Sequence, residues 1–321
     1  MNKLTNDAKK SMTSRIITAI VLLIISIPCI LFGNWFFAIF VAVALFFACH
    51  EFTNAPKNKS YKLILHLFVY LITYSFVFWI FIKNNLNEVG WNISKWSFSN
   101  SFNQISVSVI AIAIGFLVLF FLTLNKQGFD ISDATYLCTM MVFVGLSIQS
   151  LMFLRYHPGY AFGDANILDI SNSKLLFYVI LTNFLSDTGA YFTGILFGKH
   201  KMNERISPKK TWEGFVGGVV LSAVGGFLFA FLFAKHKNPI LPILNVDHWY
   251  NILIISLVIP LTANLGDFIF SSIKRNYKIK DFGTILKGHG GVLDRVDSLL
   301  VTSLVVTIII IFMEHEWNFL I

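Results

Sequence analysis

Four aspartates of this 321-residue chain lie within or at the ends of long apolar segments: Asp187, Asp267, Asp294 and Asp297. An ionised side chain at the centre of a membrane-spanning helix costs at least about 2.5 kcal/mol on insertion scales. Asp294 and Asp297 are three residues apart, so on a helix they share a face and repel each other. A divalent cation would remove that repulsion, and Mg²⁺ binds one or two carboxylates together with phosphate oxygens. The pattern therefore predicts a magnesium site at membrane depth.

Two polar segments, residues 198–213 and 271–292, contain the residue types that bind phosphate, and each carries five Lys or Arg residues. In the first, Gly198 allows close backbone approach, and Pro208 favours a turn or a helix start. Glu213 suits the positive end of the helix that follows. The phosphate-binding side chains that we expect in this segment are Lys199, Lys201, Ser207, Lys209, Lys210 and Thr211.

The second polar segment places three glycines around His289, directly before a predicted helix start. Backbone N–H groups of Gly290 and Gly291 at such a position could form a nest that binds an anion. The simpler alternative is that His289 is only a polar loop residue.

Carboxylates for a metal, lysines for phosphates and a position at membrane depth together indicate phosphoryl or nucleotidyl transfer to a lipid headgroup. Such transfer depends mainly on positioning and charge stabilisation, with the metal bridging phosphate oxygens. A phosphate acceptor has a second pKa of about 6 and is mostly ionised at pH 7, so it needs no strong general base. This agrees with the lack of an obvious Ser–His or Cys–His arrangement in the sequence.

The elements that must position these residues are membrane-spanning helices. The chain is 56% hydrophobic and only 13% charged, whereas a soluble domain has about 25% charged residues. Its apolar runs are unbroken, which excludes a disordered chain and the alternating pattern of an outer-membrane barrel. We therefore expect an all-α polytopic membrane protein. About nine spans of roughly 20 residues each are predicted near 16–33, 35–49, 63–82, 105–124, 134–154, 174–197, 214–234, 249–270 and 293–313.

Lys and Arg residues near the span ends predict the orientation. With the N-terminus in the cytoplasm, 19 of the 25 Lys and Arg residues lie on the cytoplasmic side and 6 on the other. We attribute the net charge of +8 to this bias and expect no nucleic-acid partner. The expected location is the inner (plasma) membrane, multi-pass, with the active site facing the cytoplasm. Residues 1–170 are expected to give support, dimer or lipid contacts, and residues 171–321 to form the catalytic region.

Two interpretations without an active site stay open at this point. Each buried aspartate, Asp187 above all, could pair with a basic residue of a neighbouring helix, and Arg295 could neutralise Asp294 or Asp297. A cation- or proton-coupled transporter would use the aspartates as a relay. The chain shows no internal repeat, and its intramembrane charge is concentrated at one end, which disfavours a transporter.

The stretch Ser272–Asp297, SIKRNYKIKDFGTILKGHGGVLDRVD, closely resembles the signature of the phosphatidate cytidylyltransferase (CDP-diacylglycerol synthase) family. The residues that fall on this signature are Ser272, Lys274, Arg275, Lys280, Asp281, His289, Gly290, Gly291, Asp294, Arg295 and Asp297. The stretches SDTGAYFTGILFGKHK, SPKKTWEG and NLGDFIFSSIKR resemble other segments of the family, so the likeness covers residues 180–300 or so. Lys287 departs from the Pro, Gly or Ser that is usual at its position.

The resemblance implies that CTP and phosphatidic acid react in the bilayer to give CDP-diacylglycerol and pyrophosphate. It also implies dependence on Mg²⁺, with K⁺ as a candidate second cation at the site, and a homodimer. Asp267, Asp294 and Asp297 are then the expected metal ligands. Asp187 is a lesser ligand, or it orients Lys209 or Lys210.

The chemistry of the residues themselves suggests roles for the others in this reaction. Lys209, Lys210, Lys274 and Arg275 would hold the phosphates of CTP or lipid. His289 would donate to the pyrophosphate or to the transferred phosphate, and Asp281 would orient Lys280 or His289. The other expected substrate-binding residues are Ser207, Thr211, Glu213, Gly290, Gly291 and Arg295.

Two related enzyme classes are rivals. A CTP-dependent lipid kinase would release CDP in place of pyrophosphate. CDP-alcohol phosphotransferases carry the pattern D-x-x-D-G-x-x-A-R, whereas Ser298 follows Asp297 here, which disfavours that class.

Overall fold

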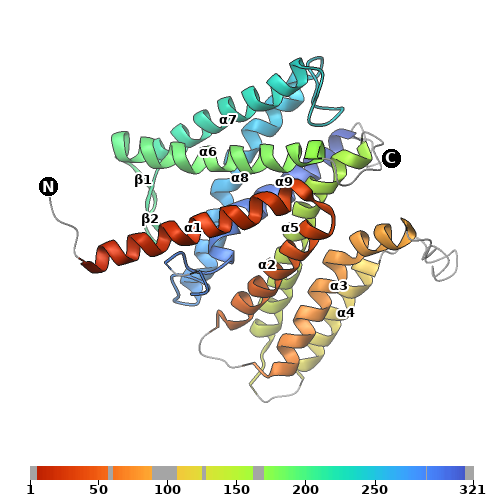
Figure 1. Ribbon diagram of the computed structural model, residues 1–321. Coiled ribbons are helices and arrows are strands. Elements are labelled where there is room, and N and C mark those ends of the chain that lie inside the picture. Colours follow the sequence, from red (N-terminus) through yellow and green to blue (C-terminus); the bar gives the residue numbers. More distant parts are fainter. Residues whose placement is uncertain are drawn as a thin grey trace. The chain divides into compact units, whose positions relative to one another are not determined.

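The computed structural model describes residues 6–56, 61–88, 107–124, 128–161, 170–286 and 288–314. These residues are almost entirely helical (Figure 1). The helices and strands are α1 (Asn6–Phe32), α2 (Asn34–Asn54), α3 (Leu63–Glu88), α4 (Val107–Leu122), α5 (Ile131–Ala161), the 3₁₀ turn η2 (Ile170–Ser173), α6 (Lys174–Phe197), β1 (Lys201–Asn203), β2 (Ser207–Thr211), α7 (Trp212–Lys235), α8 (Trp249–Asn276) and α9 (Leu293–Glu314).

The predicted class of an all-α membrane protein is confirmed. In the described part of the chain, α2, α5, α6, α7, α8 and α9 are long and apolar enough to cross a bilayer. Three further helices, α1, α3 and α4, contain shorter apolar segments, namely Ile16–Phe32, Leu63–Trp79 and Ser108–Leu122. Each of the nine predicted spans therefore coincides with a helix. Nine membrane crossings stay a prediction.

One prediction about local structure is wrong, because segment 198–213 contains an antiparallel hairpin and not only a loop. Strands β1 and β2 pair with Lys201 opposite Thr211 and Asn203 opposite Ser207. Pro208 lies within β2 and starts neither a turn nor a helix. Proline is tolerated there because a two-stranded ribbon consists only of edge strands, which have one unpaired side.

The chain divides into two compact units. The first comprises Met1–Val41 with Ser150–Ile321, and the second comprises Ala42–Gln149. In the second unit α3 and α4 pack together, and Ser108 Oγ donates to the Phe76 carbonyl at 3.2 Å. A Cβ atom at Gly145 of α5 would overlap the Phe76 ring, so this glycine lets the ring lie against the helix backbone. The predicted division at residue 170 concerns function, and stays a prediction.

In the first unit α6 and α7 form a tightly packed antiparallel pair (Figure 1). A Cβ atom at Gly218 of α7 would lie 2.7 Å from the Ser186 carbonyl oxygen, and one at Gly217 would overlap Thr193. The small residues of α7 therefore pack within the chain against α6, as glycines commonly do between membrane helices.

Helices α8 and α9 approach each other just as closely at the level of the aspartates. A Cβ atom at Gly266 would lie 2.9 Å from both the Asp297 carbonyl oxygen and the Ser298 Cα. This contact sets Asp267, the next residue of α8, beside the first turns of α9.

A buried polar network joins α6, α8 and α9. Asn183 Nδ2 donates to Ser298 Oγ at 3.0 Å, and Thr302 Oγ1 donates to Asn183 Oδ1 at 3.3 Å. Thr262 Oγ1 of α8 lies 3.4 Å from Thr302 Oγ1. Polar bonds between helices in an apolar medium fix their register. These are the three helices that carry the four aspartates.

Candidate active site

The predicted site residues gather at one end of the first unit. Helices α6, α7, α8 and α9 alternate in direction, so α6 and α8 end where α7 and α9 begin. The hairpin β1–β2 bridges α6 and α7 there, and residues 277–292 connect α8 to α9. The two polar segments singled out in the sequence therefore lie at the same end of the helices.

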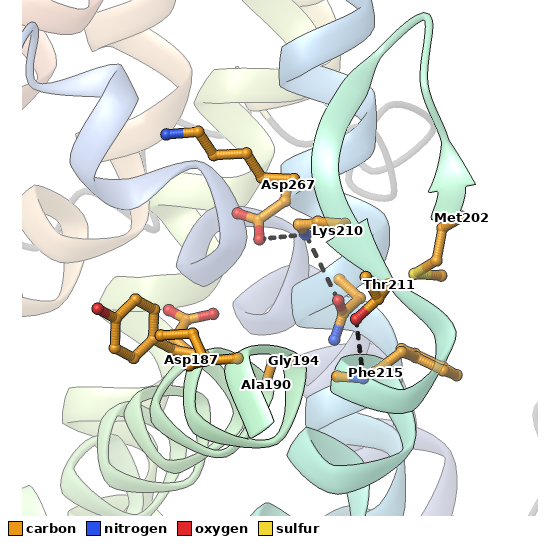
Figure 2. Close-up of a pocket in the computed structure, with 13 residues that line it drawn as sticks. Asp187, Ala190, Gly194, Met202, Lys210, Thr211, Phe215 and Asp267 are labelled. Atoms are coloured by element: carbon orange, nitrogen blue, oxygen red, sulfur yellow. Dashed lines mark hydrogen bonds and ion pairs between the residues drawn. The ribbon is translucent and has the colours of Figure 1, made fainter. Parts of the chain in front are cut away.

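A pocket of about 330 Å³ lies between α6, the β hairpin, the start of α7 and α8 (Figure 2). The polar residues of its lining are Asp187, Lys209, Lys210, Thr211, Asn264 and Asp267. Its apolar lining residues include Tyr191, Ile195, Met202 and Phe215. Tyr191 and Ile195 are exposed on the outer face of α6, so the pocket combines charged groups with a surface suited to lipid.

Lys210 connects the hairpin to α8. Its Nζ lies 2.6 Å from Asp267 Oδ2 and donates to Asn264 Oδ1 at 3.4 Å (Figure 2). The ammonium group also lies 4.8 Å from the centre of the Phe268 ring. Asp187 of α6 lines the same pocket, and this residue is exposed. Three of the residues that the sequence predicted for the site thus line one pocket: Lys210, Asp187 and Asp267.

Two of the predicted substrate-binding residues hold the hairpin in place. Thr211 caps α7, because its Oγ1 accepts from the Gly214 N–H at 3.2 Å. The Glu213 carboxylate accepts from the N–H groups of Lys199 at 3.1 Å and His200 at 3.2 Å. Its Oε1 also lies 2.5 Å from His200 Nδ1. Substrate contacts of Thr211 and Glu213 stay predictions.

A second, deeper cluster surrounds Lys274. Its Nζ donates to Asp294 Oδ1 at 2.9 Å and lies 3.8 Å from Asp297 Oδ2. Asp294 Oδ2 accepts from the backbone N–H groups of Phe282 at 2.8 Å and Gly291 at 2.9 Å. The Asp294 carboxylate is thus surrounded by the chain's own donors, and it anchors residues 282–291 to the start of α9.

Two of the glycines beside His289 adopt the left-handed backbone conformation. Gly288 and Gly290 have φ of 78° and 86°, and Leu286 N–H donates to the Gly290 carbonyl at 3.0 Å. His289 Nδ1 is buried and has no hydrogen-bond partner among the described residues. The Gly291 N–H that was expected to bind an anion binds Asp294 here. An anion-binding role for Gly290 and His289 stays a prediction.

The four aspartates form a chain of neighbouring charges. Asp267 lies near enough to repel both Asp187 and Asp297, and Asp297 also repels Asp294. In the described part of the chain, no three His, Cys, Asp or Glu side chains converge to hold a metal by themselves. Mg²⁺ usually keeps several waters and needs only one or two carboxylates besides substrate phosphates. Asp267 with Asp187 or with Asp297 supplies such a pair, so the donor set fits Mg²⁺.

The remaining predicted residues lie at the rim. Lys280, Asp281 and Arg295 are exposed, and Arg275 Nη1 donates to the Ile279 carbonyl at 3.2 Å. Ser207 lies on β2, and Lys287 lies outside the described residues. No contact between Asp281 and Lys280 or His289 is found among the residues described, so its orienting role stays a prediction.

Sequence reasoning missed Asn264, Gly266 and Asn183. Asn264 lies one helical turn before Asp267, and this spacing could have suggested a shared face. Gly266 lies in an apolar run, where close packing against another helix is the evident reason for a glycine. Asn183 is a polar residue one turn before Asp187 and is as unusual in a span as the aspartate itself.

Comparison with known proteins bears on this geometry. Residues 13–313 match the model of the cytidylyltransferase family. The chain belongs to this family. Curated phosphatidate cytidylyltransferases of Staphylococcus haemolyticus and Staphylococcus saprophyticus are each 29% identical to it over 308 residues, which span 94% of this chain and 99% of each relative. The phosphatidate cytidylyltransferase of Staphylococcus aureus strain COL is 29% identical over 304 residues, with the same coverage. Membership in the cytidylyltransferase family thus extends over the N-terminal helices, beyond the residues that the sequence motifs covered.

Proposed function

We propose that this protein transfers a cytidylyl group from CTP to phosphatidate and forms CDP-diacylglycerol and pyrophosphate. The observation that carries the proposal is the pocket, whose lining combines Lys209, Lys210 and two carboxylates with Tyr191 and Ile195, two exposed apolar residues of α6. A triphosphate needs the charged residues, and a lipid phosphate would reach them from the bilayer past the exposed face of α6. The relatives' names and the near full-length similarity agree with this reaction.

In the proposed reaction an oxygen of the phosphatidate phosphate attacks the α-phosphorus of CTP. The bond between the α-phosphorus and the oxygen that bridges it to the β-phosphorus breaks, and pyrophosphate leaves. Lys209 and Lys210 are placed to bind phosphate oxygens and orient the two substrates for in-line transfer. Lys274 and the loop anchored by Asp294 hold α8 and α9 in register beside them. Mg²⁺, held by Asp267 with Asp187 or Asp297, would neutralise charge on the phosphates.

Further features of the proposal concern the setting of the enzyme. The Lys and Arg bias supports nine crossings with the N-terminus and the site in the cytoplasm, and the expected membrane is the bacterial inner membrane. K⁺ as a second cation and a homodimer belong to this proposal as well. Asp294 was also predicted as a metal ligand, but its carboxylate already accepts from Lys274 and two backbone N–H groups, so we assign it the anchoring of the loop. The N-terminal helices up to residue 170 would then support the catalytic region or contribute lipid and dimer contacts.

The test is incorporation of CTP labelled at the α-phosphate into lipid by purified protein in phosphatidate-containing vesicles. We expect labelled CDP-diacylglycerol and one pyrophosphate per product, both lost in Asp297→Asn. Release of CDP with unlabelled lipid would instead identify a CTP-dependent kinase. Cation flux without any labelled lipid would identify a transporter.

A further inference from the structure

The site contains two Lys–Asp pairs of very different character. Lys210 and Asp267 are 26% and 24% exposed at their side chains, and they meet at the edge of the pocket. Lys274 and Asp294 are only 11% and 2% exposed. Asp294 also accepts two backbone N–H bonds, whereas among the described residues only Lys210 donates to the Asp267 side chain.

These differences determine which pair can open. Breaking a buried ion pair typically costs about 3–5 kcal/mol, whereas fully exposed pairs contribute about 1 kcal/mol or less, and the partly exposed Lys210–Asp267 pair lies nearer the second case. The Lys210 side chain reaches from a two-stranded hairpin, and Asn264 is its only second acceptor in the described residues. Lys210 can therefore leave Asp267 without disturbing the helices, and Lys274 cannot leave Asp294 in the same way.

The position of Lys210 also conflicts with metal binding. A metal ion bound through Asp267 Oδ2 would meet the Lys210 ammonium, which lies 2.6 Å from that oxygen, and one bound through Oδ1 would still lie close enough to repel it. Metal binding to Asp267 therefore favours displacement of the ammonium group, and a displaced ammonium group needs a new anion nearby. The pocket has few anionic groups to offer besides Asp187, whereas a triphosphate brings several.

We propose that the Lys210 ammonium is a resident counter-ion of Asp267, which a metal ion displaces only when a nucleotide triphosphate arrives to receive it. This inference rests on the proposed function and adds to it the order in which metal and nucleotide bind. Metal and nucleotide enter together, and metal alone binds weakly. Lys210 thus prevents unproductive metal binding and becomes a phosphate ligand when the substrate is present.

The experiment measures Mn²⁺ binding by electron paramagnetic resonance, with no nucleotide, in nanodiscs of phosphatidylcholine. Lys210→Gln is compared with Lys209→Gln, since both remove one positive charge from the lining of the same pocket but only the first uncovers Asp267. We expect Lys210→Gln to bind Mn²⁺ about fivefold more tightly than the unmodified protein, and Lys209→Gln to change the affinity less than about twofold. The gain should vanish in Lys210→Gln combined with Asp267→Asn.

Equal affinities of the two Gln variants would overturn the inference. If Lys210→Gln does not fold, Lys210→Arg decides the question, because a bidentate guanidinium is harder to displace from a carboxylate. Its Mn²⁺ affinity should fall below that of the unmodified protein, and an equal or higher affinity would contradict the inference. Cytidylyl transfer is assayed separately. If no transfer is detected, the proposed function is rejected and the Mn²⁺ affinities still stand. If transfer occurs but the two Gln variants bind Mn²⁺ equally well, only the counter-ion role of Lys210 is rejected.

Discussion

Asp294 and Asp297 lie one helical turn apart, yet the structure gives them different surroundings. Asp294 is held by Lys274 and two backbone N–H groups, whereas Asp297 accepts, within the part of the chain that the structure describes, the N–H of Ser298 alone and lies 3.8 Å from Lys274. Spacing alone predicted that the two share a face. It could not reveal which of them the chain itself would saturate, because that depends on where residues 282–291 fold back.

The two aspartates should therefore respond differently to the same substitution. Asp294→Asn leaves Lys274 without its buried partner and should lower the free energy of unfolding by about 3 kcal/mol. Asp297→Asn should leave stability nearly unchanged while abolishing turnover. Thermal unfolding in detergent, followed by size-exclusion chromatography, measures the first effect. Equal melting temperatures of the two variants would show that Asp294 does not anchor the loop.

Lys209 provides a further test of the polar residues that line the pocket. It is exposed and lines the pocket beside Lys210. Lys209→Ala should raise KM for CTP or phosphatidate about tenfold with little change in kcat, because it removes a contact made equally in the ground and transition states. Steady-state assays with each substrate varied in turn would measure this. Unchanged kinetics would show that Lys209 does not bind substrate and contributes only to the orientation of the protein in the membrane.

At the level of elements, Gly266 determines how closely α8 and α9 approach. Gly266→Ala should push the α9 backbone away from Asp267 and lower kcat about a hundredfold, because small displacements of catalytic groups are costly. Gly225→Ala on α7 is the matched control, since its Cβ atom would meet only the movable Leu185 side chain. Both changes gain similar helix propensity. Comparable activity of the two variants would show that this close contact is not needed.

The helices were predictable from sequence and the hairpin was not. Long apolar runs are unambiguous because only a helix satisfies its own backbone in lipid. Segment 198–213 has no such constraint, and its lysines and Pro208 are typical of a loop. Its strands are held by contacts between residues that are far apart in the sequence: the Glu213 carboxylate accepts from the N–H groups of Lys199 and His200. This contact forms because the chain reverses its direction between α6 and α7. The spacing of apolar residues in the sequence does not predict such a reversal.

On the scale of the whole molecule, charge bias predicts which end faces the cytoplasm. Lys201 lies on the β hairpin and Lys237 follows the far end of α7, and both are exposed. In a variant without its three cysteines, Lys201→Cys should react with an impermeant maleimide only after the cell is opened. Lys237→Cys should react in cells with an intact inner membrane. The reverse labelling would invert the topology and place the pocket outside.

The composition established the class of the molecule, and the motifs located its site within residues 180–300 or so. Neither predicted the division into Met1–Val41 with Ser150–Ile321 and Ala42–Gln149. That division depends on α2 and α5 each contributing to both units. A hydropathy pattern assigns one span at a time and contains no information about such shared helices.

The interlocked glycines of α6 and α7 have a consequence for turnover. Backbones in contact at Gly218 resist sliding past each other, so we expect the α6 and α7 sides of the pocket to stay fixed while a lysine side chain moves. This helix pair should then keep a constant cross-section in the membrane during turnover. Lateral pressure would do little work on it, and the rate should vary little between loosely and tightly packed bilayers.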